Sequence, residues 1–558
     1  MATVRPEARG PGGDDGATPS REGIRLALIG DTRTGEAGTI LNQSMDVREC
    51  LHFELDAAAE LPEDLNAIII DADRDRPDRV SNWFRAAAEI GVDHWILLSS
   101  AEVNEPRHRH PGRASESSAA RRRPINRVAL AWRRIEEEAT RSAKEHSPTV
   151  LTILRPATVA GDGSGPVGRL FGSRLAITIA GHDPTLQVLS PADLGWALRF
   201  CVEQRTEGLF NVAPAAAIPL RKALRAAGRR RLPLPHWVHR LGRRLKLAPT
   251  SLDEAQYRRY SWTVSGKALE EASGFTPRVS SHRALDSSIP ATTASFDAFG
   301  QDKAYIRTFD RTLFPFLRDF WWRVESRGLE HVPGEGGAML VGLHRGFMPL
   351  DGVMTRHVVD RERGRFVRFL IHPTLIKQPF LANFMTKLGG VVANGENAEW
   401  VLDRGGIVGV YPEGIRGAFS FYRDAHELKS FGRSDYVRIA LRNRVPIIPF
   451  VTLGSAEIFP ILGRIDWKWW QRHVEWPFFP ITPTFPWLPI PLPSKWHMQF
   501  LAPIHLAQRY PPEAADDHAT VREISLRIQD SLRETLHDMR RRRRHIFFGS
   551  LVETRGSK

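Results

Sequence analysis

Short apolar segments alternate with stretches of helical length through the first half of the chain. Four of them, IRLALIG, NAIIID, DHWILLSS and TVLTILRP, are about six to eight residues long and rich in Ile, Leu and Val. Such segments, separated by stretches long enough for a crossover helix, are typical of buried parallel strands. The pattern lasts from Ile24 to about residue 280. It predicts an α/β fold with a Rossmann-type, doubly wound parallel sheet.

A second apolar pattern begins near Asp302 and ends near Leu536, and it predicts a second α/β domain. The stretch before it is rich in Ser, Thr, Ala and Asp, which favours a linker. We therefore expect five parts: a disordered leader (1–23), a Rossmann-type domain (24–280), a linker (281–302), a second domain (303–536) and a basic tail (537–558). The leader is rich in Gly, Pro and Asp and lacks the apolar core of a signal peptide.

The chain is strongly basic. Lysine and arginine number 78 against 64 aspartates and glutamates, so the net charge is +14 and the isoelectric point is near 10.1. This excess favours anionic partners, which include phospholipid surfaces, nucleic acid and acidic carriers. With only two cysteines, Cys50 and Cys201, we expect no disulfide framework, no thiolate metal cluster and a reducing cytoplasm.

Three segments of the second half are candidates for lipid contact. A set of apolar residues follows helical spacing beside arginines, and both core packing and docking on an anionic bilayer stay open for it: Leu313, Phe316, Leu317, Phe320, Trp321 and Val324. Residues 476–494 are uncharged and aromatic, but seven prolines exclude a continuous spanning helix, so we interpret them as an apolar rim at the lipid interface. The run Arg540–Arg544 fits anionic lipid, nucleic acid or a solvated tail.

The first domain carries a glycine pattern at its first strand-to-helix turn. Gly30, Gly35 and Gly38 follow the strand LALIG, where small residues let backbone amides approach a pyrophosphate. Further along come Ser99 at a strand end, LRPATVAGDG, VLSPADLGWAL and GLFNVAP. In this order the motifs resemble the extended short-chain dehydrogenase/reductase family, similar to the nucleoside-diphosphate-sugar epimerases, across residues 24–280. The resemblance implies NAD(P) as a candidate ligand of the three glycines.

The same family transfers protons with a Tyr and a Lys four residues later. Here all seven tyrosines lie at Tyr257 or later and the first lysine is Lys144, so that pair is absent from its usual place. Without such a phenol there is no proton donor suited to hydride transfer, and we expect no catalysis from this domain. Nucleotide binding without turnover, and a regulatory or docking scaffold, both stay open.

Three motifs of the second domain occur in a fixed order. His344 follows the apolar run AMLVGL, and Asp351 follows seven residues later; VGVYPEGIRG then contains Glu413, Gly414 and Arg416, and VPIIPFVTLG comes last. Together they resemble the glycerolipid acyltransferase superfamily, the lysophosphatidate acyltransferases and their glyceride-acylating relatives, across about residues 305–510.

The chemistry of acyl transfer suits these residue types. A neutral imidazole with a pKa of about 6.5 can take a hydroxyl proton, and a carboxylate on its other nitrogen fixes the tautomer, which assigns His344 as general base and Asp351 as its partner. By the resemblance, Glu413 and Gly414 help shape the acceptor site. Arg416 could pair with a phosphate or form only a surface salt bridge. The thioester donor, acyl-CoA or acyl carrier protein, is already activated, so we expect neither a metal nor a cofactor for acyl transfer.

Two departures from the family pattern bear on the substrate. Six residues separate His344 from Asp351 where the family usually has four, so the intervening RGFMPL must turn to return the carboxylate to the imidazole. Asn394 stands near the place where the family commonly carries a phosphate-binding arginine. This leaves room for a neutral glyceride or another lipid alcohol besides a lysophospholipid.

The sequence thus predicts a fusion of an inactive Rossmann-type domain with a cytoplasmic, peripherally membrane-associated acyltransferase. Its partners would be a lipid acceptor, acyl-CoA or acyl carrier protein, and an anionic membrane surface; no nucleic acid is expected. Two rival hypotheses remain. One is an NAD(P)-dependent epimerase- or reductase-like protein with a non-catalytic lipid-binding domain, and the other is an inert lipid-binding or regulatory fusion.

Overall fold

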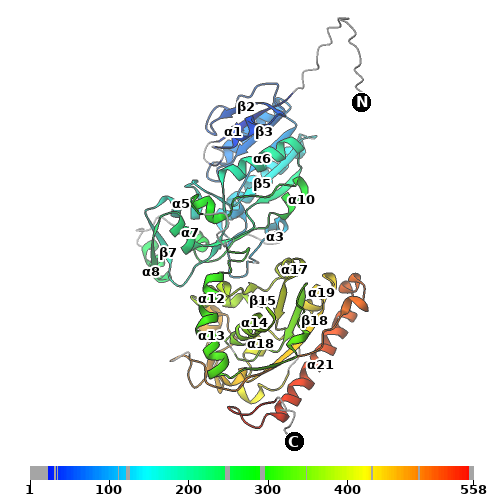
Figure 1. Ribbon diagram of the computed structural model, residues 1–558. Helices are drawn as coiled ribbons and strands as arrows, with labels where there is room; N and C mark the ends of the chain where they lie inside the picture. The colour runs from blue at the N-terminus through cyan, green and yellow to red at the C-terminus, as the bar shows by residue number, and fades with distance from the viewer. Residues whose placement is uncertain are drawn as a thin grey trace, which may run out of the picture.

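A computed structural model describes residues 23–30, 33, 36–110, 112–120, 126–146, 148–244, 252–289, 296–346, 348–428, 431–487 and 490–551. The predicted leader, apart from residue 23, lies outside these residues. The described chain forms two α/β domains arranged one beyond the other, with the N-terminal domain in blue to green and the C-terminal domain in green to red (Figure 1). This confirms the predicted fold class.

The N-terminal domain is built on a six-stranded parallel sheet. Its strand order is β10-β5-β4-β3-β1-β2. The strands are β1 (Ile24–Ile29), β2 (Val47–Phe53), β3 (Ala67–Asp71), β4 (His94–Leu98), β5 (Val150–Pro156) and β10 (Gly208–Val212). The chain places β2 on one side of β1 and β3 on the other, so the order reverses beside β1. Ligands of such sheets bind at the carboxyl ends of the strands near this point.

Helices cover both faces of this sheet, as the apolar runs require. Leu26 and Leu28 of β1 pack in one core with α1 (Ala37–Asn42) and α6 (Pro191–Gln204). Ala27 and Ile29 point the other way, into a core with α2 (Pro77–Glu89) and α4 (Arg127–Glu145). A smaller lobe follows, with β7 (Leu175–Ile179) parallel to β12 (Arg230–Leu234), flanked by α5 (Gly165–Gly172), α7 (Leu220–Ala226) and α8 (His236–Arg244).

The C-terminal domain has a seven-stranded sheet of order β13-β21-β18-β14-β17-β15-β16. The strands are β13 (Glu325–Arg327), β14 (Ala338–Gly342), β15 (Val367–Ile371), β16 (Val391–Val392), β17 (Ile407–Val410), β18 (Ile447–Leu453) and β21 (His497–Phe500). All neighbours are parallel except β18 and β21. Helix α14 (Leu350–Arg363) packs on one face, and α17 (Gly395–Asp403), α19 (Asp435–Arg442) and α21 (His518–Arg542) pack on the other.

Two predicted boundaries and one predicted helix differ from the structure. Helix α11 (Ser281–Leu285) lies inside the predicted linker, yet Ser281 Oγ donates to the Ala216 carbonyl at 2.9 Å, so the N-terminal domain extends through this helix. Helix α21 runs across the predicted start of the basic tail at residue 537, because its apolar side continues to the buried Met539. The amphipathic helix expected over 313–324 is divided into α13 (Leu313–Pro315) and a π-helical turn, Phe316–Trp321.

Several polar contacts join the two domains. The Lys387 ammonium lies 2.9 Å from the Asp183 carboxylate, and the Asn383 side chain donates to the Gly181 carbonyl at 3.0 Å. The side-chain oxygen of Asn383 accepts the Asp183 N–H at 3.0 Å. Among the described residues, no helix is both long enough and apolar enough to cross a bilayer.

Candidate active site

The candidate active site lies at the carboxyl end of β14. His344 follows this strand by two residues, and its Nδ1 lies 2.7 Å from Asp351 Oδ2. The Asp351 side chain is 1% exposed and that of His344 is 14% exposed. A carboxylate at this distance favours the tautomer with the proton on Nδ1, which leaves Nε2 as the acceptor. The structure therefore brings together the two side chains that we predicted as a catalytic pair.

The start of α14 holds the Asp351 carboxylate. Asp351 is in the first turn of this helix, and its two oxygens accept the Gly352 N–H at 2.8 Å and the Arg345 N–H at 3.3 Å. The carboxylate is thus fixed in position, as an orienting partner of an imidazole must be.

The chain between His344 and Asp351 returns the carboxylate to the imidazole, as the longer spacing requires. Pro349 immediately precedes α14, so the chain re-enters a helix at the predicted place. Gly346 has φ +94°, and a Cβ there would lie 3.0 Å from the Ser455 carbonyl oxygen. Only glycine adopts this conformation without strain. Phe347 lies outside the described residues.

An aromatic stack fixes the plane of the imidazole. Tyr411, directly after β17, stacks on His344 with ring centroids 4.9 Å apart and planes at 18°. Phe369 of β15 stacks on Tyr411 at 5.2 Å and 16°. Burial raises the pKa of the Tyr411 phenol well above its ordinary value, so the phenol stays neutral. Our sequence analysis did not single out Tyr411, although it stands two residues before Glu413.

Glu413 is buried in an ion pair and does not point freely into an acceptor site. Its Oε2 lies 2.6 Å from Arg345 Nη1, and both side chains are almost fully buried. Arg345 also donates to the carbonyls of His344 at 2.9 Å and Glu427 at 3.3 Å. Burial raises the pKa of Glu413, and the neighbouring Arg345 opposes that rise. The pair ties the histidine motif to the Pro-Glu-Gly motif, and the sequence analysis missed Arg345.

The other two residues predicted to bind substrate are Gly414 and Arg416, which come shortly after Glu413 in the sequence. Gly414 has φ +55° and begins the short helix α18 (Ile415–Ala418). The Arg416 side chain is exposed, and it makes no ion pair with any residue that the structure describes. The surface salt bridge that we considered for Arg416 is therefore not found there, and its pairing with a phosphate stays a prediction.

The Asn394 side chain stabilises the start of a helix. Its side-chain oxygen accepts the Glu396 N–H at 3.1 Å and caps the start of α17. A capping amide supplies no positive charge for an acceptor phosphate.

An aromatic ledge adjoins the site. Phe419, just after α18, packs edge-to-face on Trp476 and Phe478. These two residues belong to a segment with β19 (Gly463–Ile465), α20 (Lys468–Val474) and β20 (Phe479–Ile481). The segment exposes six large apolar side chains, which we call the aromatic ledge: Leu462, Ile465, Trp467, Trp469, Ile481 and Trp487. The predicted apolar rim 476–494 is thus half buried and half exposed.

The N-terminal domain has a cavity of about 390 Å³ at the carboxyl ends of its strands. Gly30 ends β1 with φ +107°, and a Cβ there would lie 2.8 Å from Asp71 Cβ. A Cβ on Gly38 would collide with the His52 ring. Both glycines are therefore required by packing. Gly35 lies outside the described residues.

The Arg33 side chain lies at the carboxyl ends of β3 and β4, where a dinucleotide would approach the sheet. Arg33 Nε donates to Asp71 Oδ1 at 2.7 Å. Its other N–H groups donate to the carbonyls of Ala72, Leu98 and Ser99, at the ends of β3 and β4. Burial raises the pKa of Asp71, and the charge of Arg33 opposes the rise. A guanidinium with this many buried partners is costly to displace.

Helix α4 presents an indole and a carboxylate toward the same strand ends. Trp132 and Glu136 are four residues apart, which puts them on one helix face. Ser99 Oγ donates to Glu136 Oε1 at 2.6 Å, and Arg155 pairs with the same carboxylate at 2.6 Å. The Arg33 guanidinium lies 5.4 Å from the Trp132 ring centroid. Trp132 and Glu136 thus lie on one face of α4, close to Arg33 and Ser99.

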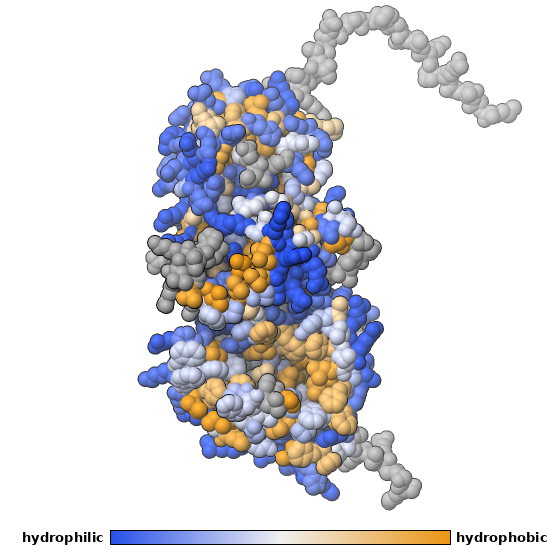
Figure 2. Space-filling view, turned by 90° about the vertical axis from the view of Figure 1, so that its left-hand side faces the viewer, coloured by the Kyte–Doolittle hydropathy of each residue, from blue (hydrophilic) through white to orange (hydrophobic). Residues whose placement is uncertain are grey.

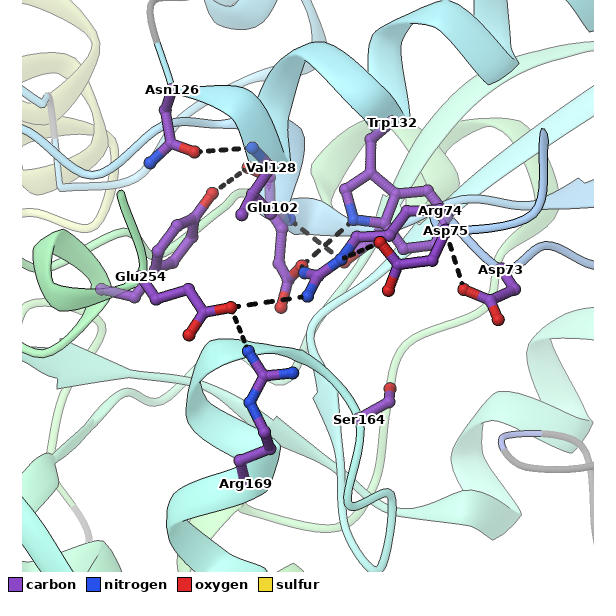
Figure 3. A network of polar contacts seen from close by, with 12 residues as sticks. Asp73, Arg74, Asp75, Glu102, Asn126, Val128, Trp132, Ser164, Arg169 and Glu254 are labelled. Atoms are coloured by element: carbon purple, nitrogen blue, oxygen red, sulfur yellow. Dashed lines mark hydrogen bonds and ion pairs between the residues drawn. The ribbon is translucent and has the colours of Figure 1, made fainter. Parts of the chain in front are cut away.

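Acidic side chains line much of the cavity (Figure 3). Glu102 accepts from Arg74 at 3.0 Å and from the Trp132 indole at 3.1 Å, while Arg169 pairs with Glu254. Burial raises the pKa of Glu102. Seven carboxylates and four arginines line the cavity: Glu54, Asp56, Asp71, Asp73, Asp75, Glu102 and Asp162, with Arg33, Arg74, Arg76 and Arg169. An acid-rich lining and a tethered Arg33 do not fit the pyrophosphate of NAD(P).

Residues 323–453 match the protein-family model described as Acyltransferase. This range contains His344, Asp351, Glu413 and Arg416, so the C-terminal domain is an acyltransferase domain. An uncharacterised protein of Mycobacterium tuberculosis is 36% identical over 261 residues, which cover 46% of this chain and 72% of that protein. A Mycobacterium leprae protein is also 36% identical, over 45% of this chain and 70% of its own length. The chain belongs to the same family as these mycobacterial proteins.

Other matches are less similar in sequence to this chain. A Bos taurus protein named "DGAT1/2-independent enzyme synthesizing storage lipids" is 25% identical over 30% of this chain and 49% of that protein. Two solved structures, one titled "MoeE5 in complex with UDP-glucose and NAD" and the other a UDP-glucose 4-epimerase of Thermus thermophilus in complex with NAD, are 14% and 16% identical. Each covers 47% of this chain and 96% of its own, with TM-scores of 0.36 and 0.35.

Proposed function

We propose that this protein transfers a fatty acyl group from acyl-CoA or acyl carrier protein to a lipid hydroxyl at a membrane surface. The observation that carries the proposal is the 2.7 Å contact between His344 Nδ1 and Asp351 Oδ2 inside an acyltransferase domain. The name of the bovine relative, which refers to storage-lipid synthesis, supports a lipid acceptor.

In the proposed reaction His344 acts as general base. Its Nε2 takes the proton of the acceptor hydroxyl while the hydroxyl oxygen attacks the thioester carbonyl carbon, and the carbonyl electrons move onto oxygen. Asp351 stabilises the imidazolium that forms. The tetrahedral intermediate then collapses, the carbon–sulfur bond breaks, and the leaving thiolate regains the proton from the imidazolium. The products are an ester and a free thiol.

The proposed acceptor is a neutral glyceride in preference to a lysophospholipid. Asn394 caps α17 where the resemblance predicts a phosphate-binding arginine. Arg416 is exposed near the site and would serve a phosphate of the acyl donor. The aromatic ledge beside α18 would rest in the headgroup region, where Trp and Ile side chains partition favourably, and the basic excess of the chain would strengthen contact with anionic lipid.

For the N-terminal domain we propose the scaffold alternative, because Arg33 and the acidic lining oppose a dinucleotide. Titration with NADH, followed by its fluorescence, should show no saturable binding up to about 1 mM. Saturable binding, or turnover of reduced nicotinamide, would favour the epimerase- or reductase-like hypothesis.

The test of the main proposal is product identification. The full chain is incubated with acyl-CoA and, separately, with monoacylglycerol, diacylglycerol and lysophosphatidate in mixed micelles, and the new ester is identified by mass spectrometry. The same assay is run with acyl carrier protein as donor. His344→Ala should lower kcat by about 10³-fold or more, because the base is lost.

The matched control is His537→Ala, since His537 is exposed on α21. It should leave the rate unchanged. Equal, near-background rates for the wild type and His344→Ala would favour the inert lipid-binding fusion.

A further inference from the structure

The small lobe of the N-terminal domain exposes a compact group of large apolar side chains. Five residues of β7, β12 and α8 form it, and we call it the β7–α8 patch: Leu175, Ile177, Leu232, Trp237 and Leu241. Ile177 is 40% exposed and Trp237 is 66% exposed. A folded domain seldom leaves so many large apolar groups together at its surface without a partner.

Strand geometry explains why these side chains face outward. Leu175 and Ile177 alternate along β7 with the buried Ala176 and Thr178, so one face of the strand packs on the core and the other does not. In the parallel register Ile177 stands opposite Leu232, which extends the apolar surface across β12.

Helix α8 continues the same surface. Trp237 and Leu241 are four residues apart and lie on one helix face. On another side of the helix, a ring nitrogen of His239 lies 3.3 Å from the Thr178 carbonyl oxygen, which attaches α8 to β7. The helix is therefore docked by its polar side and presents its apolar side outward.

The sequence that contains β12 and α8 is strongly basic. From Gly208 through Leu252 the sequence contains ten lysines and arginines and no aspartate or glutamate. Arg230 stands opposite Leu175 in the strand register and is exposed. Surfaces that enter the headgroup layer of an anionic bilayer typically have basic residues around exposed apolar side chains, including Trp.

Strand β7 and helix α8 lie on the left-hand side of the molecule in Figure 1. Figure 2 shows this side, with an apolar area flanked by strongly hydrophilic residues on the N-terminal domain and a second apolar area on the acyltransferase domain. The contacts of Lys387 with Asp183 and of Asn383 with Gly181 hold the two domains together. The two apolar areas of Figure 2 therefore face the same side of the molecule.

We propose that the β7–α8 patch is a bilayer-docking surface, so that the Rossmann-type domain serves as a membrane platform for the acyltransferase domain. The occupant is anionic phospholipid. Nucleic acid and an acidic carrier protein would use the arginines, but neither explains four exposed aliphatic side chains in one patch. The inference rests on the proposed membrane association and is independent of acyl transfer itself.

The test is vesicle co-sedimentation of the full chain with phosphatidylcholine vesicles that contain either no or about 30% phosphatidylglycerol. Wild type should bind the anionic vesicles, and the double variant Ile177→Glu/Leu232→Glu should bind them at least about tenfold more weakly, because two charges would enter the apolar layer. The control Met45→Glu, at a 92% exposed apolar residue of the same domain outside the patch, should bind like wild type. Unchanged thermal unfolding of each variant shows that it is folded.

Three results would overturn the proposal: double-variant binding equal to wild type, wild-type binding that does not depend on phosphatidylglycerol, or wild type without vesicle binding. The same variants are also titrated with a fluorescent oligonucleotide and with acyl carrier protein. A selective loss of either of these ligands, with vesicle binding retained, would assign the patch to that partner. Acyl transfer to micellar acceptors is measured in parallel, so that the proposed function can stand or fail separately.

Discussion

At the scale of single residues, the site is organised by charges that are buried in pairs. Asp351 is held by two backbone amides and His344, and Glu413 is held by Arg345. Each buried carboxylate has a partner that offsets part of the cost of its removal from water. The two pairs have different roles. Asp351 positions the His344 imidazole that meets the substrate, and the Arg345–Glu413 pair joins two segments of backbone.

Asp351→Asn should lower kcat by about 10²- to 10⁴-fold with little change in KM, because the amide favours the wrong tautomer of His344 and does not stabilise the imidazolium. Release of thiol from acyl-CoA measures the rate. Asp360→Asn, on the same helix, is the matched control and should retain the wild-type rate. A fully active Asp351→Asn enzyme would show that His344 does not act through this carboxylate.

Arg345→Met should destabilise the domain by about 3 to 5 kcal/mol, because it leaves Glu413 buried without its cation. The double variant Arg345→Met/Glu413→Leu removes both charges and should recover most of that loss. Denaturant unfolding followed by tryptophan fluorescence gives both values. If the double variant were no more stable than the single one, the ion pair would not be the reason for the loss.

At the scale of elements, the sequence predicts what depends on local pattern. The apolar runs become the strands β1, β3, β4 and β5, since a strand buried on both faces must be apolar throughout. The His344–Asp351 contact is local in sequence and was also anticipated. Its catalytic role stays a prediction.

Features that depend on distant packing were not predictable in this way. Arg345 and Glu413 are 68 residues apart, and no spacing rule joins them. The helix expected over 313–324 ends after Trp321 because Trp322 is buried in the core. There the Trp322 ring stacks on the Trp496 ring, with centroids 4.4 Å apart. Tertiary packing of this kind overrides helical periodicity.

The turn between β14 and α14 yields a further prediction. Gly346→Ala forces a side chain into a left-handed conformation 3.0 Å from the Ser455 carbonyl oxygen, so it should cost about 1 to 3 kcal/mol and displace His344, with a lower kcat. Gly364→Ala is a matched control, because Gly364 has φ +64° at the end of α14 but open space around its Cα. It should lose stability and keep its kcat. Equal kcat values for the two variants would contradict the prediction.

At the scale of the whole molecule, polar contacts near β7 and α16 (Leu381–Lys387) couple the domains, and so do others, such as Arg109 with Glu475 and Ser115 with Glu396. Lys387→Met removes the cation beside the buried Asp183, and we expect the two domains to unfold in better-separated steps in calorimetry. Lys303→Met, at an exposed lysine of α12 (Lys303–Arg311), should leave the profile unchanged. An unaltered profile for Lys387→Met would mean that this contact contributes little to coupling.

The stack of Phe369, Tyr411 and His344 limits how a substrate can arrive. Tyr411 covers one face of the His344 ring, and the Asp351 carboxylate binds its Nδ1. Only the edge of the imidazole that carries Nε2 therefore remains for proton exchange. The proton must leave the hydroxyl in the plane of the imidazole, so the acceptor has to enter edge-on and its carbon chain must bend away from Tyr411. Bulky branching next to the hydroxyl would meet the phenol ring, and the stack should therefore act as a filter for primary alcohols over hindered ones.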